Sequence, residues 1–187
     1  MNERQIEAAY RARLDERRRL AAALAQLYDE TASSWLETQR ALLIAVGRPR
    51  IPLAVTKRIN REGARSVFTD ARKLASQFSD DTGIHPLDNV ANNPRPGLRR
   101  WVAINTATTE KTEWRAAWAS VHLDGAVSMA ATVGGHRRYD GVVLRDSQVD
   151  SSAIETAVVD FMALIRVWSH GSSPWWWCSA VSFVLVG

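Results

Sequence analysis

The feature that most constrains this fold is an Asp-Gly pair between two runs of β-prone residues. Asp124-Gly125 follows residues 114–123 and precedes residues 126–133. An Asp-Gly pair in this setting is typical of the two-residue type I′ turn of a β-hairpin. A turn of two residues pairs Trp118 with Ala131. We therefore predict an antiparallel hairpin in the second half of the chain.

This register predicts that one face of the hairpin is strongly apolar. Side chains alternate between the two faces of a strand, so every second residue points the same way. His122 lies near the turn on this face, where we expect a half-buried, hydrogen-bonded histidine. Residues 101–104 and 141–144 are also β-prone and are expected to add strands. The apolar positions of the predicted face are Trp114, Ala116, Trp118, Val127, Met129, Ala131 and Val133.

Residues 152–169 predict an amphipathic helix that covers this face. Ser152 and Glu155 have the spacing of a capping box, which satisfies two backbone amides at the start of a helix. A small antiparallel sheet packed by one helix gives the fold class α+β. Apolar residues recur at steps of four, three, four and three, at Ile154, Val158, Phe161, Ile165 and Trp168.

The N-terminal segment, residues 3–46, has the pattern of a helix. An apolar stripe at four-residue spacing is followed, after a polar gap at residues 17–19, by a second stripe in helical phase. The alanines at positions 21–25 have high helix propensity. The two stripes contain Ile6, Tyr10 and Leu14, and then Leu24, Tyr28, Trp35, Leu42 and Val46.

Two arrangements of this segment are open. One is a single helix of about 65 Å, at about 1.5 Å per residue, which would need a partner chain and so predicts self-association. The other is a helical hairpin broken at residues 29–34, with Ser34 as the N-cap of the second helix. In either case Gly47 is expected to end the helix as a C-cap.

A cluster of breaker residues, Asn92 to Gly97, marks the predicted boundary between two units. We expect a helical, basic region at residues 1–91 and a sheet-plus-helix unit at residues 98–170. Residues 171–187 then form an apolar, Trp-rich tail.

The formal net charge of +4 is unevenly distributed along the 187 residues. Residues 1–100 hold 18 Lys and Arg against 12 Asp and Glu, whereas residues 101–187 hold 6 against 8. The densest basic stretch runs from Arg48 to Lys73. Such an excess can meet a polyanion, although a solvated helix face explains it as well.

Within the basic stretch, two short helices are predicted at residues 53–60 and 64–78. The stretch from Pro52 to Lys73 resembles the helix-turn-helix motif of bacterial DNA-binding regulators. Apolar residues of the first helix, such as Ile59, would pack against the Val67-Phe68 pair of the second. Gly63 lies later than the turn glycine of that motif, so the link between the helices is longer here.

This resemblance implies binding to duplex DNA. In helix-turn-helix proteins the second helix enters the major groove, where Arg is the usual reader of guanine. The extent of the segment is residues 52–78. The side chains that would contact DNA are Arg58, Arg61, Arg65, Ser66, Thr69, Arg72 and Lys73.

A second candidate site is the loop after the hairpin. Two glycines leave backbone amides accessible, and a histidine with two arginines adds positive charge, so the loop could hold an anion. A solvated turn is the alternative. The residues are Gly134, Gly135, His136, Arg137 and Arg138.

The sequence contains no motif for a metal, a cofactor or a catalytic nucleophile. The four histidines lack metal-ligand spacing, and the single cysteine, Cys178, excludes an internal disulfide. No nucleotide-binding motif or nucleophile elbow is present. We therefore expect no metal and no cofactor, and we favour a protein that is not an enzyme over a cofactor-free hydrolase assembled from distant residues.

The tail carries three consecutive tryptophans, Trp175 to Trp177, before an apolar run. Three readings are open: a strand over residues 180–186 at a sheet edge, a non-native tail, or contact with a membrane surface. No run of about 18 apolar residues is present. The charged N-terminal pattern lacks the features of a secretory signal, so we expect a cytoplasmic protein.

These observations predict a DNA-binding or regulatory protein that uses the segment at residues 52–78. The alternative is a non-enzymatic assembly or peripheral-membrane module. That module would use the long N-terminal helix and the Trp-rich tail.

Overall fold

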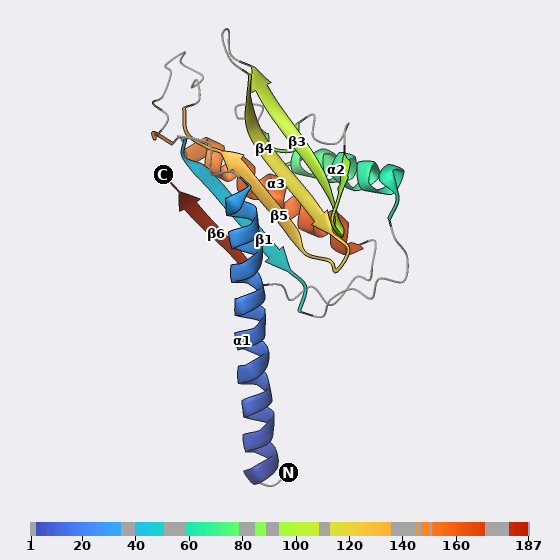
Figure 1. The fold of residues 1–187 in the computed structure, drawn as a ribbon, viewed down its shortest axis with the longest axis vertical. Helices are drawn as coiled ribbons and strands as arrows, with labels where there is room; N and C mark the ends of the chain where they lie inside the picture. The colour runs from blue at the N-terminus through green and yellow to red at the C-terminus, as the bar shows by residue number, and fades with distance from the viewer. Residues whose placement is uncertain are drawn as a thin grey trace.

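The computed structural model describes residues 3–34, 40–50, 59–78, 85–88, 94–108, 113–135, 145, 147–149, 151–170 and 180–186. They form three helices and six strands, an α+β fold (Figure 1). The helices are α1 (Glu3–Ser33), α2 (Arg61–Ala75) and α3 (Ser151–His170). The strands are β1 (Leu42–Arg48), β2 (Arg95–Gly97), β3 (Arg100–Thr108), β4 (Glu113–His122), β5 (Val127–Thr132) and β6 (Ala180–Val186).

The six strands form one antiparallel sheet in the order β2-β3-β4-β5-β1-β6. β1 lies between β5 and β6, with Ala45 paired to Met129 on one side and to Phe183 on the other. The predicted helix over residues 3–46 is therefore wrong at Ser34 and over residues 40–46, and Gly47, the expected C-cap, lies within β1. A short apolar run such as residues 42–46 suits a strand buried on both faces as well as a helix, so periodicity alone cannot separate the two.

One face of the sheet is covered by α2 and α3, which lie behind it in Figure 1. Phe68 of α2 and Phe161 of α3 are fully buried there, together with Leu87. They pack against Val121 and Met129 of the sheet. The predicted amphipathic helix over residues 152–169 is confirmed as α3, with its apolar stripe on the sheet.

The second half of α1 covers the opposite face. Leu24 and Leu27 pack on Ile44, Val46 and Trp118 of the sheet. The first half of α1 extends beyond the sheet to the N-terminus (Figure 1). The molecule thus has three layers, with a helical arm that projects from one of them.

The predicted hairpin forms, but with a three-residue loop in place of the two-residue turn. The amide of His122 donates to the carbonyl of Ala126 at 2.8 Å, and Gly125 has a φ of 93°. Glycine takes this left-handed conformation readily, which suits the last residue of a three-residue loop. Asp124 helps to close the loop, because its Oδ1 accepts a hydrogen bond of 3.1 Å from the Ala126 amide.

The longer loop moves the pairing by one residue and reverses the faces of β4. Trp118 pairs with Ala130, not with Ala131. Trp118 packs on the α1 side of the sheet, whereas Ala119 and Val121 face α2 and α3. The predicted apolar face is thus correct for β5 and wrong for Trp118. The side chains of Trp114 and Ala116 lie outside the described part of the chain.

The two expected units contribute to the same sheet. β1, from the N-terminal half, lies between β5 and β6, and the breaker cluster at residues 92–97 contains β2. The expected strand at residues 141–144 and the tail segment 171–179 are outside the described residues. Residues 180–186 form an edge strand, β6 beside β1, which is one of the three open readings of the tail. Among the helices that the structure describes, none is long and apolar enough to cross a bilayer.

Candidate functional site

Helix α2 carries most of the residues predicted to contact DNA. It begins at Arg61, three residues earlier than expected, because Asn60 caps it. The Asn60 Oδ1 accepts a hydrogen bond of 2.8 Å from the Gly63 amide, which satisfies one of the unpaired donors at a helix start. Asn60 itself has an extended backbone, with φ −86° and ψ 179°.

The first helix of the expected helix-turn-helix is only partly within the described residues. Its last two residues, Ile59 and Asn60, are not helical, so the prediction of a helix to Asn60 is wrong there. The Ile59 carbonyl accepts a hydrogen bond of 3.1 Å from the Trp101 indole, which ties this segment to β3. Residues 51–58, with Arg58, lie outside the described residues.

The apolar stripe of α2 packs against α3 and the sheet, which together we call the body of the protein. Ala64, Phe68, Ala71 and Ala75 are at most 1% exposed. Phe68 packs in the core against α3 and the sheet, and Val67 lies partly buried beside it. The Val67-Phe68 pair therefore anchors α2 to the body.

The opposite face of α2 is exposed and mixed in charge. Ser66 donates to Asp70 at 3.0 Å, Arg65 lies 3.9 Å from Glu62, and Arg72 forms an ion pair with Asp88. These acids offset part of the positive charge of the helix. The exposed residues predicted for DNA contact are Arg61, Arg65, Ser66, Thr69, Arg72 and Lys73.

In the predicted anion loop, both described glycines already use their backbone amides. The Gly134 amide donates to the Ala41 carbonyl at 3.1 Å, and the Gly135 amide donates to the Arg145 carbonyl at 3.1 Å. Gly135 has a φ of 75°, and its carbonyl accepts from Arg40 at 3.4 Å. These contacts hold the start of the loop to its neighbours. His136, Arg137 and Arg138 lie outside the described residues.

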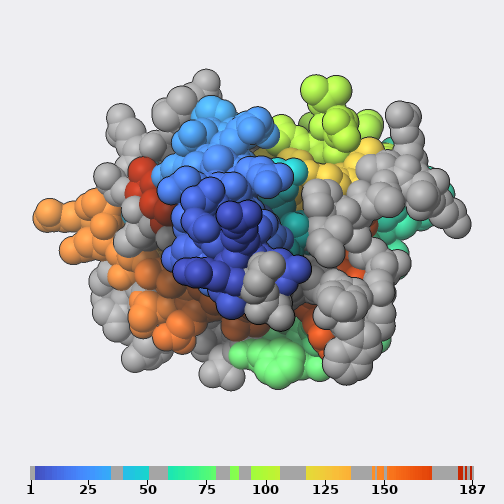
Figure 2. Space-filling model, turned by 90° about the horizontal axis from the view of Figure 1, so that it is seen from below, coloured from blue at the N-terminus to red at the C-terminus, as the bar shows by residue number. Residues whose placement is uncertain are grey.

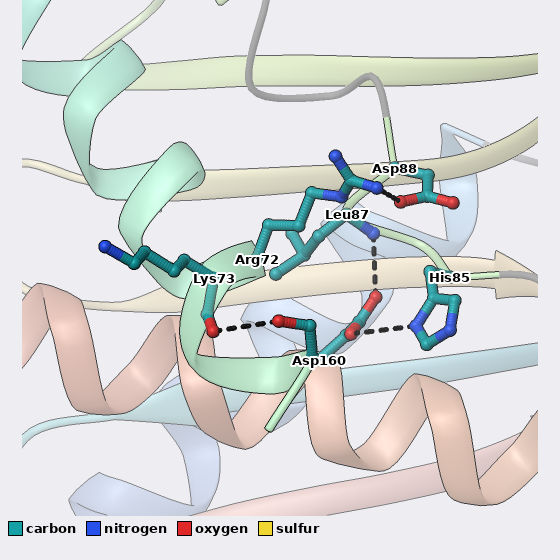
Figure 3. A network of polar contacts seen from close by, with 7 residues as sticks. Arg72, Lys73, His85, Leu87, Asp88 and Asp160 are labelled. Carbon is teal, nitrogen blue, oxygen red and sulfur yellow. Dashed lines mark hydrogen bonds and ion pairs between the residues drawn. The ribbon is translucent and has the colours of Figure 1, made fainter. Parts of the chain in front are cut away.

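A buried carboxylate beneath α2 was not predicted from the sequence. Asp160 of α3 is 1% exposed, and its Oδ2 accepts a hydrogen bond of 2.8 Å from the Leu87 amide. Its Oδ1 lies 3.7 Å from Nδ1 of His85 (Figure 3). The surface pair of Arg72 and Asp88 lies beside this site.

Burial raises the pKa of Asp160 to about 6, while the Leu87 amide and the His85 imidazole oppose the rise. Among the described residues, Oδ1 has no hydrogen-bond donor. A buried carboxylate is costly when ionised, so Asp160 keeps its proton to a higher pH than an exposed aspartate does. The sequence feature that marks this site is Asp160 itself, a charged residue directly before Phe161 of the apolar stripe of the predicted helix at residues 152–169.

A second polar cluster lies on the α1 face of the sheet. The Ser120 hydroxyl lies 2.9 Å from Nε2 of His122 and 2.7 Å from the Ser128 hydroxyl. Burial lowers the pKa of His122 to about 4, with Arg100 and Arg48 acting in the same direction. The expected half-buried, hydrogen-bonded histidine is thus present, but on the face opposite to the predicted one. The neutral imidazole contacts both serines, on the face of the sheet that the second half of α1 covers.

A shallow groove follows α1 past this cluster. One hollow of about 530 Å³ is lined by residues that include Glu30, Arg48, Arg99 and His122. Arg48 and Asp124 form an ion pair of 2.9 Å across it. The groove contains both signs of charge, and among the described residues no group of three His, Cys, Asp or Glu could hold a metal ion.

Exposed apolar side chains recur along the projecting half of α1. Residues 3–15 are all exposed. On this arm Ile6, Tyr10 and Leu14 are 54%, 69% and 37% exposed. Figure 2 views the molecule from this end, with the arm in front of the body. The arm therefore presents an amphipathic helix that the rest of the described chain does not cover.

Comparison of the chain with models of known families, with curated proteins and with solved structures gives no match.

Proposed function

We propose that the chain is an assembly module that associates with other copies through the projecting half of α1. The observation that supports this proposal is the stripe of Ile6, Tyr10 and Leu14 on a helix segment that is exposed along residues 3–15. A helix that packs on nothing is marginal in water, because most helical stability in proteins comes from a covered apolar face. A partner helix supplies that cover.

The body of the protein holds the arm in a defined direction. Leu24, Leu27 and Thr31 are buried at the other end of α1. Near the base of the arm, Arg50 donates two hydrogen bonds to Glu16, at 2.7 and 2.8 Å. An arm anchored in this way loses little further freedom on association, so binding costs less conformational entropy.

Analytical ultracentrifugation of the full chain tests the proposal. We expect concentration-dependent self-association of the wild type, and a monomer when Ile6→Asp and Tyr10→Asp are combined. Leu98→Asp is the matched control, because Leu98 is 91% exposed on the β2–β3 turn, away from the arm. A wild type that stays monomeric at all concentrations, or a double variant that associates as the wild type does, refutes the assembly function.

We also propose DNA binding as a second candidate function, through the outward face of α2. The two faces of that helix support this proposal. One face buries the apolar stripe, and the opposite face exposes Arg61, Arg65, Arg72 and Lys73. The resemblance of residues 52–73 to helix-turn-helix regulators points the same way. Contact of the C-terminal tail with a membrane surface is a weaker alternative, because residues 180–186 are used as β6.

Salt-dependent binding to duplex DNA tests the second candidate. The combined variant Arg65→Ala, Arg72→Ala and Lys73→Ala should weaken binding and reduce the slope of log affinity against log salt by about 3. The control removes the same charge from exposed sites elsewhere, with Arg95→Ala, Arg145→Ala and Arg166→Ala. Equal slopes for the two variants, or no binding at low salt, argue against contact through α2.

A further inference from the structure

Four of the charged residues in the N-terminal part of α1 lie symmetrically about Tyr10 in the sequence. Ile6 and Leu14 lie four residues before and after it. Glu7 and Arg13 lie three residues away on either side, and Glu3 and Arg17 lie seven residues away. In each charged pair the acid comes first and the base comes second.

These residues share one face of the helix. At about 100° per residue, positions three, four and seven steps from Tyr10 all fall within about 60° of it. Glu16, which is tied to Arg50, lies six steps away, about 120° around the helix. The ion pair of Glu16 with Arg50 therefore lies outside the Tyr10 face.

We propose that two copies of the chain pair their arms antiparallel, with the two-fold axis at Tyr10. This inference rests on the proposed assembly function and adds the orientation of the partner. In this arrangement Ile6 of one arm lies at the level of Leu14 of the other, and the two Tyr10 side chains meet at the centre. Glu3 and Glu7 of each copy lie at the levels of Arg17 and Arg13 of its partner, respectively.

A parallel pairing of the two arms places like charges beside each other. In register, it places Glu3 beside Glu3, Glu7 beside Glu7, Arg13 beside Arg13 and Arg17 beside Arg17. Like charges across a helix interface are unfavourable, whereas opposite charges set orientation and register. The charge pattern of the arm therefore selects a second copy in the antiparallel orientation.

A set of charge-reversal variants tests the orientation. The acid-reversed variant combines Glu3→Arg with Glu7→Arg, and the base-reversed variant combines Arg13→Glu with Arg17→Glu. In the antiparallel dimer, either change places like charges opposite each other, and we expect the dimer dissociation constant to rise about tenfold or more at low salt. The variant with all four changes restores the pairs, so its dissociation constant should return to within about threefold of the wild type.

The outcomes separate this inference from the assembly function. If the wild type is monomeric, the assembly function itself fails. If the wild type associates and the Ile6→Asp, Tyr10→Asp variant does not, assembly through the arm stands. In that case, equal dissociation constants for the two half-reversed variants and the wild type would overturn the antiparallel pairing. Helical content by circular dichroism of each variant controls for loss of the arm's structure.

Discussion

Oδ1 of Asp160 lies 3.7 Å from Nδ1 of His85, next in sequence to Phe161 of the apolar core. The second oxygen of the same carboxylate accepts the Leu87 amide at 2.8 Å. The pair joins α3 to the short described segment 85–88, which has no regular secondary structure beyond a turn. The carboxylate thus holds a non-repetitive segment on the helix layer.

Asp160→Asn should remove the loss of folding stability that the wild type undergoes as the pH rises. The unfolded carboxyl loses its proton near pH 4, whereas burial keeps the folded carboxyl protonated to about pH 6. Ionisation of Asp160 therefore lowers wild-type stability between pH 4 and pH 6 and the loss persists above that. The asparagine Oδ1 can still accept the Leu87 amide.

Urea denaturation at a series of pH values checks this expectation. The free energy of unfolding of the variant, relative to the wild type, should increase by up to about 3 kcal/mol from pH 4 to pH 7. Glu155→Gln serves as the control, because it removes an exposed carboxylate from the same helix and keeps Asp160. A difference from the wild type that is constant with pH would contradict the buried-carboxylate account.

His122 should remain neutral in the folded protein well below its ordinary pKa. Burial beside Ser120 and Ser128 lowers its pKa from 6.5 to about 4. Since the unfolded imidazole binds a proton first, this group costs stability as the pH falls from about 6.5 to about 4. NMR of the ring nitrogens should show one protonated nitrogen at pH 5.5. Two protonated nitrogens at that pH would refute the assignment.

Phe68→Ala should be strongly destabilising, because the side chain is fully buried between α3 and the sheet. We expect a loss of about 3–5 kcal/mol in the free energy of unfolding. Phe78→Ala makes the same chemical change at a site that is 71% exposed, and should cost less than about 0.5 kcal/mol. Equal losses at the two positions, measured by urea denaturation, would contradict the placement of α2.

Gly47→Ala should clash with α3. A Cβ at this position would lie 3.0 Å from Ile165 Cδ1 and 3.4 Å from Phe161 Cζ. We expect a loss of about 1–3 kcal/mol, as for an overpacked core. Ile165→Val removes the closest methyl group and alone should cost about 0.5–1.5 kcal/mol.

The two changes at this contact should not be additive. The double variant, Gly47→Ala with Ile165→Val, should lose less stability than the sum of the single variants by about 0.5 kcal/mol or more. Simple additivity in a double-mutant cycle would show that Ile165 is not the neighbour that excludes a side chain at Gly47.

Local patterns predicted the elements whose signals are local. The apolar stripe of residues 152–169 predicted α3, although the helix begins at Ser151 and so includes Ser152, the expected cap, and Asp124-Gly125 predicted the β4–β5 hairpin. The exact register did not follow, because two- and three-residue loops share the Asp-Gly signature. One residue of difference moved Trp118 and His122 to the other face.

Features that depend on contacts between distant parts of the chain could not be predicted, for a different reason. Residues 42–48 form a strand because β5 and β6 are available on both sides, which no local window contains. The same holds for Asp160, since its partners His85 and Leu87 are distant in the chain. The exposed arm of α1 was predicted as helix from its spacing, and its partner stays a prediction.

The position of β1 has a consequence for the order in which the molecule can form. β1 is made early in synthesis, but both of its neighbours, β5 and β6, come from the second half of the chain. Until they arrive, the hydrogen-bonding groups of Leu42 to Arg48 have no strand to pair with. Contacts of such long sequence separation slow folding and leave apolar edges exposed in the meantime. The sheet is therefore completed by the last strand described, and a nascent chain that ends before Ala180 carries β1 as an open edge.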